Sequence, residues 1–278
     1  MNNPNPYRCF DVRLAARTRL SESFMRLTLR GDDLGQCSAT LLDQRVKLVL
    51  GAPAQLDQLL VDDWYAAWQR ADPRPDIRTY TLSAVRPGDA EVDVDVVLHG
   101  TRADGAGPAS AYAQDGAIGS RLLLVAADRV RAGHDSAGVA YHPGGARRVL
   151  LLADETALPA VANILQARAD GVRYELVVEV PHVSDVRALD ADRVTWRVRA
   201  RGESVLDVPP FDISVGDGDV VEEELLWDEA EGAPEGSYLW AAGEAGMIRA
   251  VRAAAKRAGF DRSSSSFMGY WRRGVASV

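Results

Sequence analysis

Cysteine is nearly absent from the sequence: the 278 residues contain only Cys9 and Cys37, far apart in the chain. A disulfide framework is therefore excluded, and no C-x-x-C pair suggests a zinc site. No apolar run approaches the roughly 20 residues that a membrane-spanning helix needs. Met1–Tyr7 is rich in Asn and Pro and has no apolar core. We therefore expect neither a membrane span nor a signal peptide, and the cytoplasm is the default location.

Several catalytic signatures are missing as well. The sequence has no H-x-x-x-H, no G-x-S-x-G nucleophile turn and no G-x-G-x-x-G dinucleotide fingerprint. Its four His residues are scattered, and His134 and His142 are expected to be loop residues rather than ligands. We therefore expect no metal site. No segment repeats at a fixed period, which excludes a solenoid or a propeller.

Positive charge is also in deficit, with 32 Lys and Arg against 40 Asp and Glu and a formal net charge of -8. This balance argues against a general nucleic-acid binder and against binding to an anionic membrane surface. Any anionic ligand must therefore be held by a local group of basic residues that acts against the overall field.

The first half of the chain has the pattern of a β-structure. Asp93 and Asp95 alternate with Val between Val92 and Val96, which predicts a strand with one apolar and one acidic face. Asp57–Arg70 is predicted to be a helical insertion with Leu60, Trp64 and Trp68 at helical spacing. Many short strands with few helices indicate a barrel or a sandwich. The predicted strands are Cys9–Leu14, Phe24–Leu29, Arg45–Leu50, Arg78–Leu82 and Glu91–Leu98.

The second half alternates strands with helices, which predicts an open parallel sheet. Arg147–Ala153 is a continuous apolar run of the kind that buried parallel strands show. Further strands are predicted at Tyr174–Val180, Val194–Val198, Tyr238–Ala242 and Ser266–Tyr270. Helices are predicted at Leu158–Leu165, at the acidic stretch Val220–Trp227 and at Ala245–Ala258. The Gly-rich loop Arg131–Gly145 separates two expected domains, residues 1–130 and 146–278.

The run Arg78-Thr79-Tyr80-Thr81 is the first candidate binding motif. On a strand, Arg78 and Tyr80 project from one face, while Thr79 and Thr81 project from the other. An arginine beside an aromatic ring can hold a phosphate and cover a flat ring system. Taken alone, the run also fits an ordinary barrel strand with a surface Arg–Tyr pair.

A second candidate follows at His99-Gly100 and Gly107-Pro108-Ala109-Ser110. Proline at the first helical position after a glycine is a good helix start. The unpaired backbone N–H groups of such a start form an anion site that a diphosphate fits, and Ser110 can add a hydroxyl. An ordinary capped helix would have the same pattern.

Three further candidates lie in the second half. Asp154-Glu155-Thr156-Ala157-Leu158-Pro159-Ala160 directly follows the buried strand, at the point where α/β sheets bind nucleotides. Trp240–Gly246 has the same strand–turn–helix pattern, and its glycines permit close approach of a ligand. Gly269-Tyr270-Trp271-Arg272-Arg273-Gly274 places two aromatic and two basic residues near the C-terminus. Routine turns and a packed terminal strand remain alternatives.

Together and in this order, the motifs resemble the siderophore-interacting protein family, the NAD(P)H-dependent ferric-siderophore reductases of the ferredoxin-reductase-like superfamily. The resemblance covers Val12 to Gly274. Its pieces are Val46-Lys47-Leu48, Arg78–Thr81, Val97-Leu98-His99-Gly100, Gly107–Ser110, Asp154–Ala160, Gly243-Glu244 and Gly269–Gly274. It implies an antiparallel FAD-binding β-barrel followed by an α/β parallel-sheet domain that binds NADPH or NADH. NAD(P)H would pass a hydride to FAD, and single electrons would then reduce Fe(III) and release Fe(II).

The resemblance also implies roles for the residues. Arg78, Thr79, Tyr80 and Thr81 would hold FAD, with Tyr80 against the isoalloxazine and Thr81 near its N5 edge. His99, Gly100 and the start Gly107, Pro108, Ala109, Ser110 would bind the ribityl-diphosphate part. Asp154, Glu155, Thr156, Gly243 and Glu244 would line the nicotinamide nucleotide cleft. Lys47, Arg249, Arg272 and Arg273 would bind the anionic ferric siderophore. The resemblance implies no catalytic acid or base among these residues, because the flavin carries the chemistry.

Two positions depart from the family pattern. Ser83 stands where members usually carry arginine, and Ala153 stands where they usually carry glycine. The first would weaken FAD binding and the second would crowd the nucleotide. Arg187 favours NADPH, while the neighbouring Asp185 favours NADH.

Three functions therefore stay open: a ferric-siderophore reductase, a general flavin or quinone reductase or electron donor, and a non-redox binding protein. A monomer is the expectation, with the oligomeric state left open.

Overall fold

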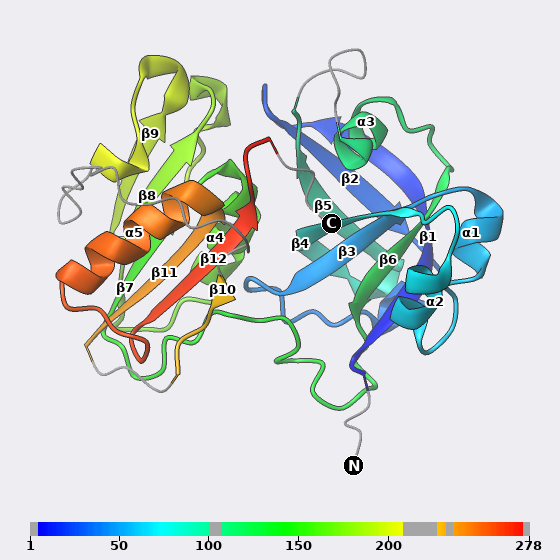
Figure 1. Cartoon of the computed structure of the whole chain (residues 1–278), viewed down its shortest axis with the longest axis horizontal. Coiled ribbons are helices and arrows are strands. Elements are labelled where there is room, and N and C mark those ends of the chain that lie inside the picture. The colour runs from blue at the N-terminus through cyan, green and yellow to red at the C-terminus, as the bar shows by residue number, and fades with distance from the viewer. Residues whose placement is uncertain (1–4, 100–106, 208–226, 232–235, 275–278) are drawn as a thin grey trace. The chain divides into compact units, whose positions relative to one another are not determined.

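The computed structural model describes residues 5–99, 107–207, 227–231 and 236–274. The chain divides into two compact units, residues 1–139 and residues 140–277 (Figure 1). Each unit has its own sheet and its own core, and each is described by itself.

The first unit is a closed antiparallel barrel with the strand order β1-β2-β5-β4-β3-β6. Its strands are β1 (Tyr7–Arg19), β2 (Phe24–Arg30), β3 (Arg45–Leu50), β4 (Asp76–Arg86), β5 (Glu91–Val97) and β6 (Arg121–Ala127). Its helices are α1 (Pro53–Asp57), α2 (Trp64–Arg70) and α3 (Pro108–Asp115), with short 3-10 turns at η1 (Leu34–Gln36) and η2 (Pro87–Asp89). The barrel predicted from the alternating strands is confirmed.

Strand β5 is buried on both faces, although its sequence alternates valine with aspartate. Val92, Val94 and Val96 lie in the barrel core. On the other face, Arg86 forms a two-pronged hydrogen bond with Asp93 at 2.7 and 2.8 Å. Arg26 does the same with Asp95 at 2.7 and 3.0 Å. The arginines cover the carboxylates, so the acidic face is a paired layer rather than an exposed patch.

Two elements of the barrel differ from the sequence expectation. Of the predicted helix Asp57–Arg70, only Trp64–Arg70 forms the helix α2, and Asp57 is the last residue of the separate helix α1. The Asp63 carboxylate accepts the N–H of Ala66 at 3.2 Å and starts α2. Leu60 therefore does not share a face with Trp64: Leu60 is 41% exposed and Trp64 is buried. Strand β6 was missed because it is buried on both sides and shows no alternation.

The second unit is a six-stranded sheet with the order β10-β12-β11-β7-β8-β9. Its strands are β7 (Arg148–Ala153), β8 (Arg173–Val180), β9 (Arg193–Val198), β10 (Trp227–Asp228), β11 (Ser237–Glu244) and β12 (Ser265–Trp271). Five of them run parallel, but the edge strand β10 is antiparallel to β12, so the sheet is mixed rather than fully parallel. Of the predicted acidic helix, residues 220–226 lie outside the described residues and Trp227 begins β10.

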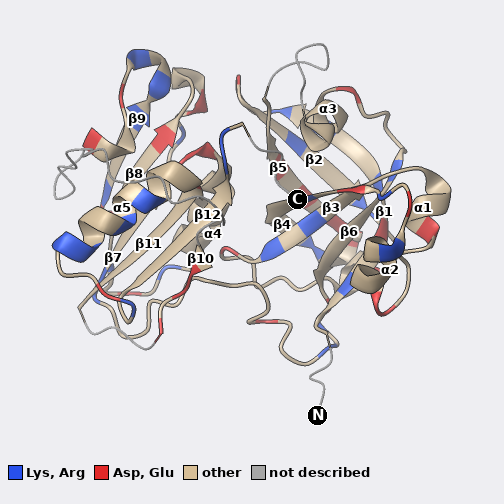
Figure 2. Cartoon of the chain, viewed as in Figure 1, with Lys and Arg blue, Asp and Glu red and all other residues tan. Residues whose placement is uncertain are grey.

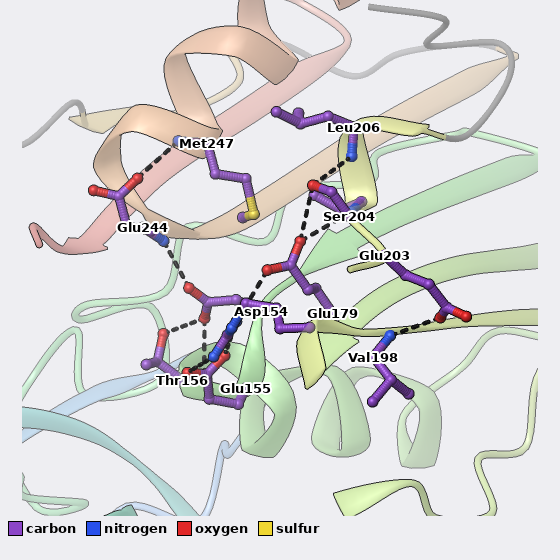
Figure 3. Close-up of polar contacts among 12 residues, drawn as sticks. Asp154, Glu155, Thr156, Glu179, Val198, Glu203, Ser204, Leu206, Glu244 and Met247 are labelled. Carbon is purple, nitrogen blue, oxygen red and sulfur yellow. Dashed lines mark hydrogen bonds and ion pairs between the residues drawn. The ribbon is translucent and has the colours of Figure 1, made fainter. Parts of the chain in front are cut away.

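Helices α4 (Leu158–Gln166) and α5 (Ala245–Arg257) lie on opposite faces of this sheet (Figures 1 and 3). The apolar side of α5, with Ile248 and Val251, packs on Leu239 and Ala241 of the central strands. Short 3-10 turns follow the strand ends, at η4 (Glu155–Ala157), η5 (Val183–Asp185), η6 (Arg199–Arg201) and η7 (Val205–Asp207). Because the strands are parallel, these turns lie together at the C-terminal ends of the strands, where ligands bind in such folds.

Candidate functional site

The first candidate motif lies on β4. The register pairs Val46 with Tyr80 and Lys47 with Thr79, so Tyr80 and Lys47 project from opposite sides of the two strands. Tyr80 packs against the barrel core, and burial raises the pKa of its phenol above the ordinary value. Lys47 Nζ donates to Thr79 Oγ1 at 2.9 Å. Burial and the charge of Arg45 lower the pKa of Lys47.

Arg78 lies on the same side of β4 as Tyr80, as the sequence predicts. Its Nη1 donates to the carbonyl of Ile77 at 2.7 Å and lies 3.9 Å from Asp76. An arginine has five N–H donors, so this contact leaves most of the guanidinium for a further acceptor. The buried Thr81 follows on the other side of the strand.

Ser83 occupies a β-bulge just after this motif. Leu82 pairs with Val94 and the next pair is Ala84 with Asp93, so Ser83 is an extra residue in β4. The Oγ of Ser83 is buried and has no hydrogen-bond partner among the described residues. Ser83 is therefore an irregular point of the strand, and its hydroxyl has no hydrogen-bond partner among the described residues.

The second candidate motif connects the end of β5 to the start of α3. The N–H of His99 donates to Ser110 Oγ at 3.1 Å, so the structure brings these two predicted residues together. The α3 helix begins at Pro108, with Gly107 as its N-cap and with the first helical hydrogen bond from Ala111 N to Gly107 O at 2.9 Å. The N–H groups before Ala111 have no partner within a helix. Gly100 lies outside the described residues.

Gly107 is not required by the fold. Its φ is -61°, which any residue adopts, and an added Cβ would meet no atom of the described residues within 4 Å. Among the described residues, none fills the space beside the helix start. This is the kind of helix start at which backbone N–H groups bind anions.

In the second unit, the Asp154 carboxylate joins the ends of three neighbouring strands, and Figure 3 shows its contacts with Thr156 and Glu244. Its Oδ1 accepts the N–H of Thr156 at 2.8 Å and the hydroxyl of Thr156 at 2.5 Å. Its Oδ2 accepts the N–H of Glu244 at 2.7 Å and the indole N–H of Trp271 at 2.7 Å. Burial and the neighbouring Glu155 carboxylate raise the pKa of Asp154 to about 7.

Gly243 is required by this arrangement. Its φ is +152°, and an added Cβ would lie 2.6 Å from Cγ of Asp154. Only glycine lets the backbone approach the carboxylate this closely. Asp154–Thr156 and Gly243-Glu244 therefore lie together at one edge of the sheet.

The Glu155 carboxylate turns away from this cluster into an ion-pair network. Arg199 donates to Glu155 at 2.8 and 2.5 Å and to Glu179 at 3.0 Å. Glu179 also accepts the hydroxyl of Ser204 at 3.1 Å and the N–H of Val205 at 2.9 Å. Burial disfavours the charge of Arg199, but its bonds to Glu155 and Glu179 outweigh burial and raise its pKa. Arg199 therefore links the turn after β7 to strand β8 and to the turn after β9.

The predicted basic residues of this unit lie on α5 and after β12. Arg249 is half-buried on α5, along which Lys and Arg residues gather (Figure 2). Arg272 is half-buried and Arg273 is exposed directly after β12. The backbone N–H of Arg273 donates to Glu244 Oε1 at 3.3 Å.

The sequence-based site assignments do not include Trp271, Arg199 and Glu179, which contact Asp154 or Glu155 or their partners. Trp271 lies within the motif Gly269–Gly274, so the sequence does indicate its neighbourhood. Arg199 and Glu179 had no local signal, because only the strand order brings them to Glu155.

Two protein-family descriptions match the chain, one in each unit. The family described as siderophore-interacting FAD-binding domain matches residues 13–130. The family described as siderophore-interacting protein matches residues 146–274. The chain belongs to the siderophore-interacting protein family.

An uncharacterised protein of Mycobacterium tuberculosis is 30% identical over 283 residues, which cover 97% of this chain and 91% of that protein. Among solved structures, a siderophore-interacting protein from Aeromonas hydrophila aligns with a TM-score of 0.68 and 23% identity, over 98% of this chain and 94% of the other. A ferredoxin reductase of carbazole 1,9a-dioxygenase aligns with a TM-score of 0.57 and 16% identity, over 96% of this chain and 70% of the other.

These likenesses establish a ferredoxin-reductase-like two-domain fold. With the FAD-binding family match, they support an FAD-dependent oxidoreductase. Among the described residues, no helix has the length and apolar character to cross a membrane.

Proposed function

We propose that this member of the family is an NAD(P)H-dependent reductase of ferric siderophores. The observation that carries the proposal is that the two family matches cover both units, residues 13–130 and residues 146–274. The first match supports a flavin-binding part, and we assign the nucleotide that such a reaction needs to the part covered by the second match. The proposed domains are residues 1–130 for FAD and residues 146–278 for the nucleotide, with residues 131–145 between them.

The residues of the barrel fit an FAD. The start of α3, where no described residue fills the space beside Gly107, suits a diphosphate. The remaining donors of Arg78 suit the same group, and the unused Oγ of Ser83 lies in the same strand. We assign the ribityl-diphosphate part to His99, Gly100 and Gly107–Ser110. We assign the flavin ring to Arg78–Thr81, with Tyr80 against it.

For the nicotinamide nucleotide we assign Asp154–Thr156 and Gly243-Glu244. The side chains of Asp154 and Glu155 are already hydrogen-bonded within the protein. They would therefore shape the site through the backbone and turns that they hold, rather than through direct contact. Gly243 lets the turn lie directly against the Asp154 carboxylate, where a side chain would collide with it.

Bound FAD would accept a hydride and release single electrons to Fe(III), the substrate. The chain's own part is to orient the reactants and to bind the anionic siderophore. No protein acid or base is needed at the iron. Lys47, Arg249, Arg272 and Arg273 are the residues that we assign to the anionic substrate, against the net charge of -8.

The test begins with the purified protein, which should be yellow and should release FAD rather than FMN on denaturation. Under anaerobic conditions, NADH or NADPH should bleach the flavin, and a ferric siderophore should restore its colour. Fe(II) should form in step, detected with a ferrous chelator. If a small quinone restores the colour but none of the ferric siderophores does, the protein is a general flavin or quinone reductase. If neither nucleotide bleaches a flavin-loaded protein, it is not a reductase of this kind.

A further inference from the structure

The Glu155 carboxylate is held by a single side chain. Its two oxygens accept from Arg199 at 2.8 and 2.5 Å, and no other residue in the described part of the chain donates to them. Glu155 is 1% exposed, so water has little access to replace a lost donor. Glu155 therefore keeps its place in the turn after β7 only as long as Arg199 keeps its own.

Glu179, the other carboxylate that contacts Arg199, has further donors. Its Oε1 accepts from Arg199 at 3.0 Å. Its Oε2 accepts the hydroxyl of Ser204 at 3.1 Å (Figure 3) and the N–H of Val205 at 2.9 Å. Glu179 would therefore stay bonded if Arg199 were changed, and the effect of such a change would fall mainly on Glu155.

The turn that carries Arg199 is itself fixed. It directly follows β9 as the 3-10 turn η6. At its start, the N–H of Val198 donates to Glu203 Oε2 at 2.8 Å. Within it, the N–H of Ala200 donates to the carbonyl of Pro181 at 3.1 Å. The guanidinium is thus presented to Glu155 from a turn that is bonded on both sides, two strands away from β7 in the sheet.

The turn that carries Glu155 lies where the order of the parallel strands reverses. From β7 the chain adds β8 and β9 on one side, and later β11 and β12 on the other. Ligands of open α/β sheets bind beyond the strand ends at such a point. On the β11 side, Asp154 joins the turn to Glu244 by accepting the N–H groups of Thr156 and Glu244 at 2.8 and 2.7 Å. On the β8 side, the pair of Arg199 and Glu155 holds it.

We propose that Arg199 is a positioning residue for the nicotinamide nucleotide, because through Glu155 it fixes the turn against which the nucleotide binds. Arg199 needs no contact with the nucleotide for this role. Its positive charge is offset by the two carboxylates of Glu155 and Glu179, which makes it a poor site for a phosphate. The inference rests on the proposed function for its ligand, but the hold of Arg199 on the turn can be measured without a ligand.

The test is a double-mutant cycle on the flavin-loaded protein, with NADPH and NADH titrated separately. Arg199→Lys keeps the positive charge but loses the two-pronged geometry. It should raise the dissociation constant of the nucleotide roughly tenfold in the wild-type background, and less than about threefold in a Glu155→Ala background, where the route through Glu155 is already lost. The rate of flavin bleaching at saturating nucleotide should stay within about twofold of wild type. Equal effects in both backgrounds, or an unchanged dissociation constant in Arg199→Lys, would overturn the proposal.

Amide hydrogen exchange gives a reading that needs no ligand. Exchange at Thr156, whose N–H bonds to Asp154 within the turn, should be roughly tenfold faster in Arg199→Lys. Arg148→Lys is the matched control, because Arg148 forms the same two-pronged pair with Glu175 at the other end of these strands. It should change neither the dissociation constant nor the exchange. If wild type binds neither nucleotide, the proposed function fails, while the exchange still decides whether Arg199 holds the turn. Unchanged exchange in Arg199→Lys would refute the positioning role.

Discussion

Arg199 and Glu155 form a two-pronged ion pair at 2.8 and 2.5 Å, although 44 residues separate them. Glu155 is 1% exposed, and Arg199 contacts Glu179 as well. A buried carboxylate that loses its cation stays uncompensated in a medium of low polarity. Arg199 therefore joins the turns after β7 and β9 to strand β8.

Removal of this cation should destabilise the second unit. Arg199→Ala should lower the free energy of unfolding by about 3 kcal/mol, because Glu155 and Glu179 both lose their partner. Urea unfolding followed by circular dichroism measures this change. Arg168→Ala is the control, since its partner Asp190 is 88% exposed, and the cost should stay below about 1 kcal/mol. Equal losses in both variants would contradict the buried role of Arg199.

Gly243→Ala should damage both stability and nucleotide binding. The new Cβ would lie 2.6 Å from Asp154 Cγ at a φ of +152°, so either the carboxylate or the turn must move. We expect a loss of about 2 kcal/mol or more in unfolding free energy and weaker binding of NADPH or NADH. Gly88→Ala, where a Cβ meets nothing within 4 Å, should be close to neutral. A fully stable Gly243→Ala protein would show that this close approach does not exist in solution.

Tyr80→Ala should weaken FAD binding more than Tyr112→Ala. Both rings are half-buried against the same barrel core, so the two truncations remove similar packing. Tyr112 uses its hydroxyl on Ser120, with the two oxygens 2.6 Å apart, and we assign it no flavin contact. Loss of a stacking face should cost on the order of 1 kcal/mol or more, about a fivefold rise in the FAD dissociation constant. Equal dissociation constants, from titration of the apoprotein, would reject the assignment of Tyr80.

The basic residues should matter for the anionic substrate alone. Lys47→Ala combined with Arg249→Ala should slow flavin reoxidation by an anionic ferric siderophore roughly tenfold or more in stopped-flow mixing. Reoxidation by a small neutral quinone should be almost normal. Added salt should slow the wild type and change the variant much less.

The control for this pair is Arg70→Ala combined with Arg257→Ala. It removes the same charge from exposed positions on α2 and α5. This control should keep both rates. If both acceptors slow equally in the Lys47 and Arg249 variant, these residues serve the flavin or the fold instead.

Stability should depend on pH through Asp154. Its pKa is raised from 3.8 to about 7, so the folded state holds this proton more tightly than the unfolded chain does. The stabilising contribution of this group is therefore complete below about pH 4 and is lost as the pH rises through about 7. Asp154→Asn cannot titrate here. The unfolding free energy of wild type minus that of the variant should fall across this window, by up to about 1.4 kcal/mol per pH unit.

Other charged groups lie near Asp154, and their titration should contribute equally to wild type and to Asp154→Asn. Glu155 raises its pKa, Arg199 pairs with Glu155, and the Glu244 carboxylate lies at the neighbouring strand end, where it accepts the N–H of Met247. Urea unfolding of both proteins from pH 4 to pH 8 therefore reports the difference only. A difference that grows with pH would show instead that the four donors keep Asp154 ionised.

The sequence by itself determined the two-domain architecture and the positions of the motifs. Period-two alternation placed β2, β3 and β5, and the apolar run before Asp154 placed β7, because side-chain periodicity follows directly from backbone geometry. The same locality explains the failures. Strand β6 has no alternation to detect, and a side-chain cap at Asp63 divides a stretch whose hydrophobic spacing predicts one helix.

Only the tertiary structure decided how the motif residues are used. Asp154 and Glu155 are adjacent in sequence, but one contacts Trp271 from β12 and the other contacts Arg199 from beyond β9. Those partners depend on the strand order and on a single bulged residue in β12, which no local pattern specifies. Burial then removes water as an alternative partner, so each carboxylate must find its donors within the fold. For this reason residue types at the strand ends predicted where a site would lie, but not which side chains would remain available to a ligand.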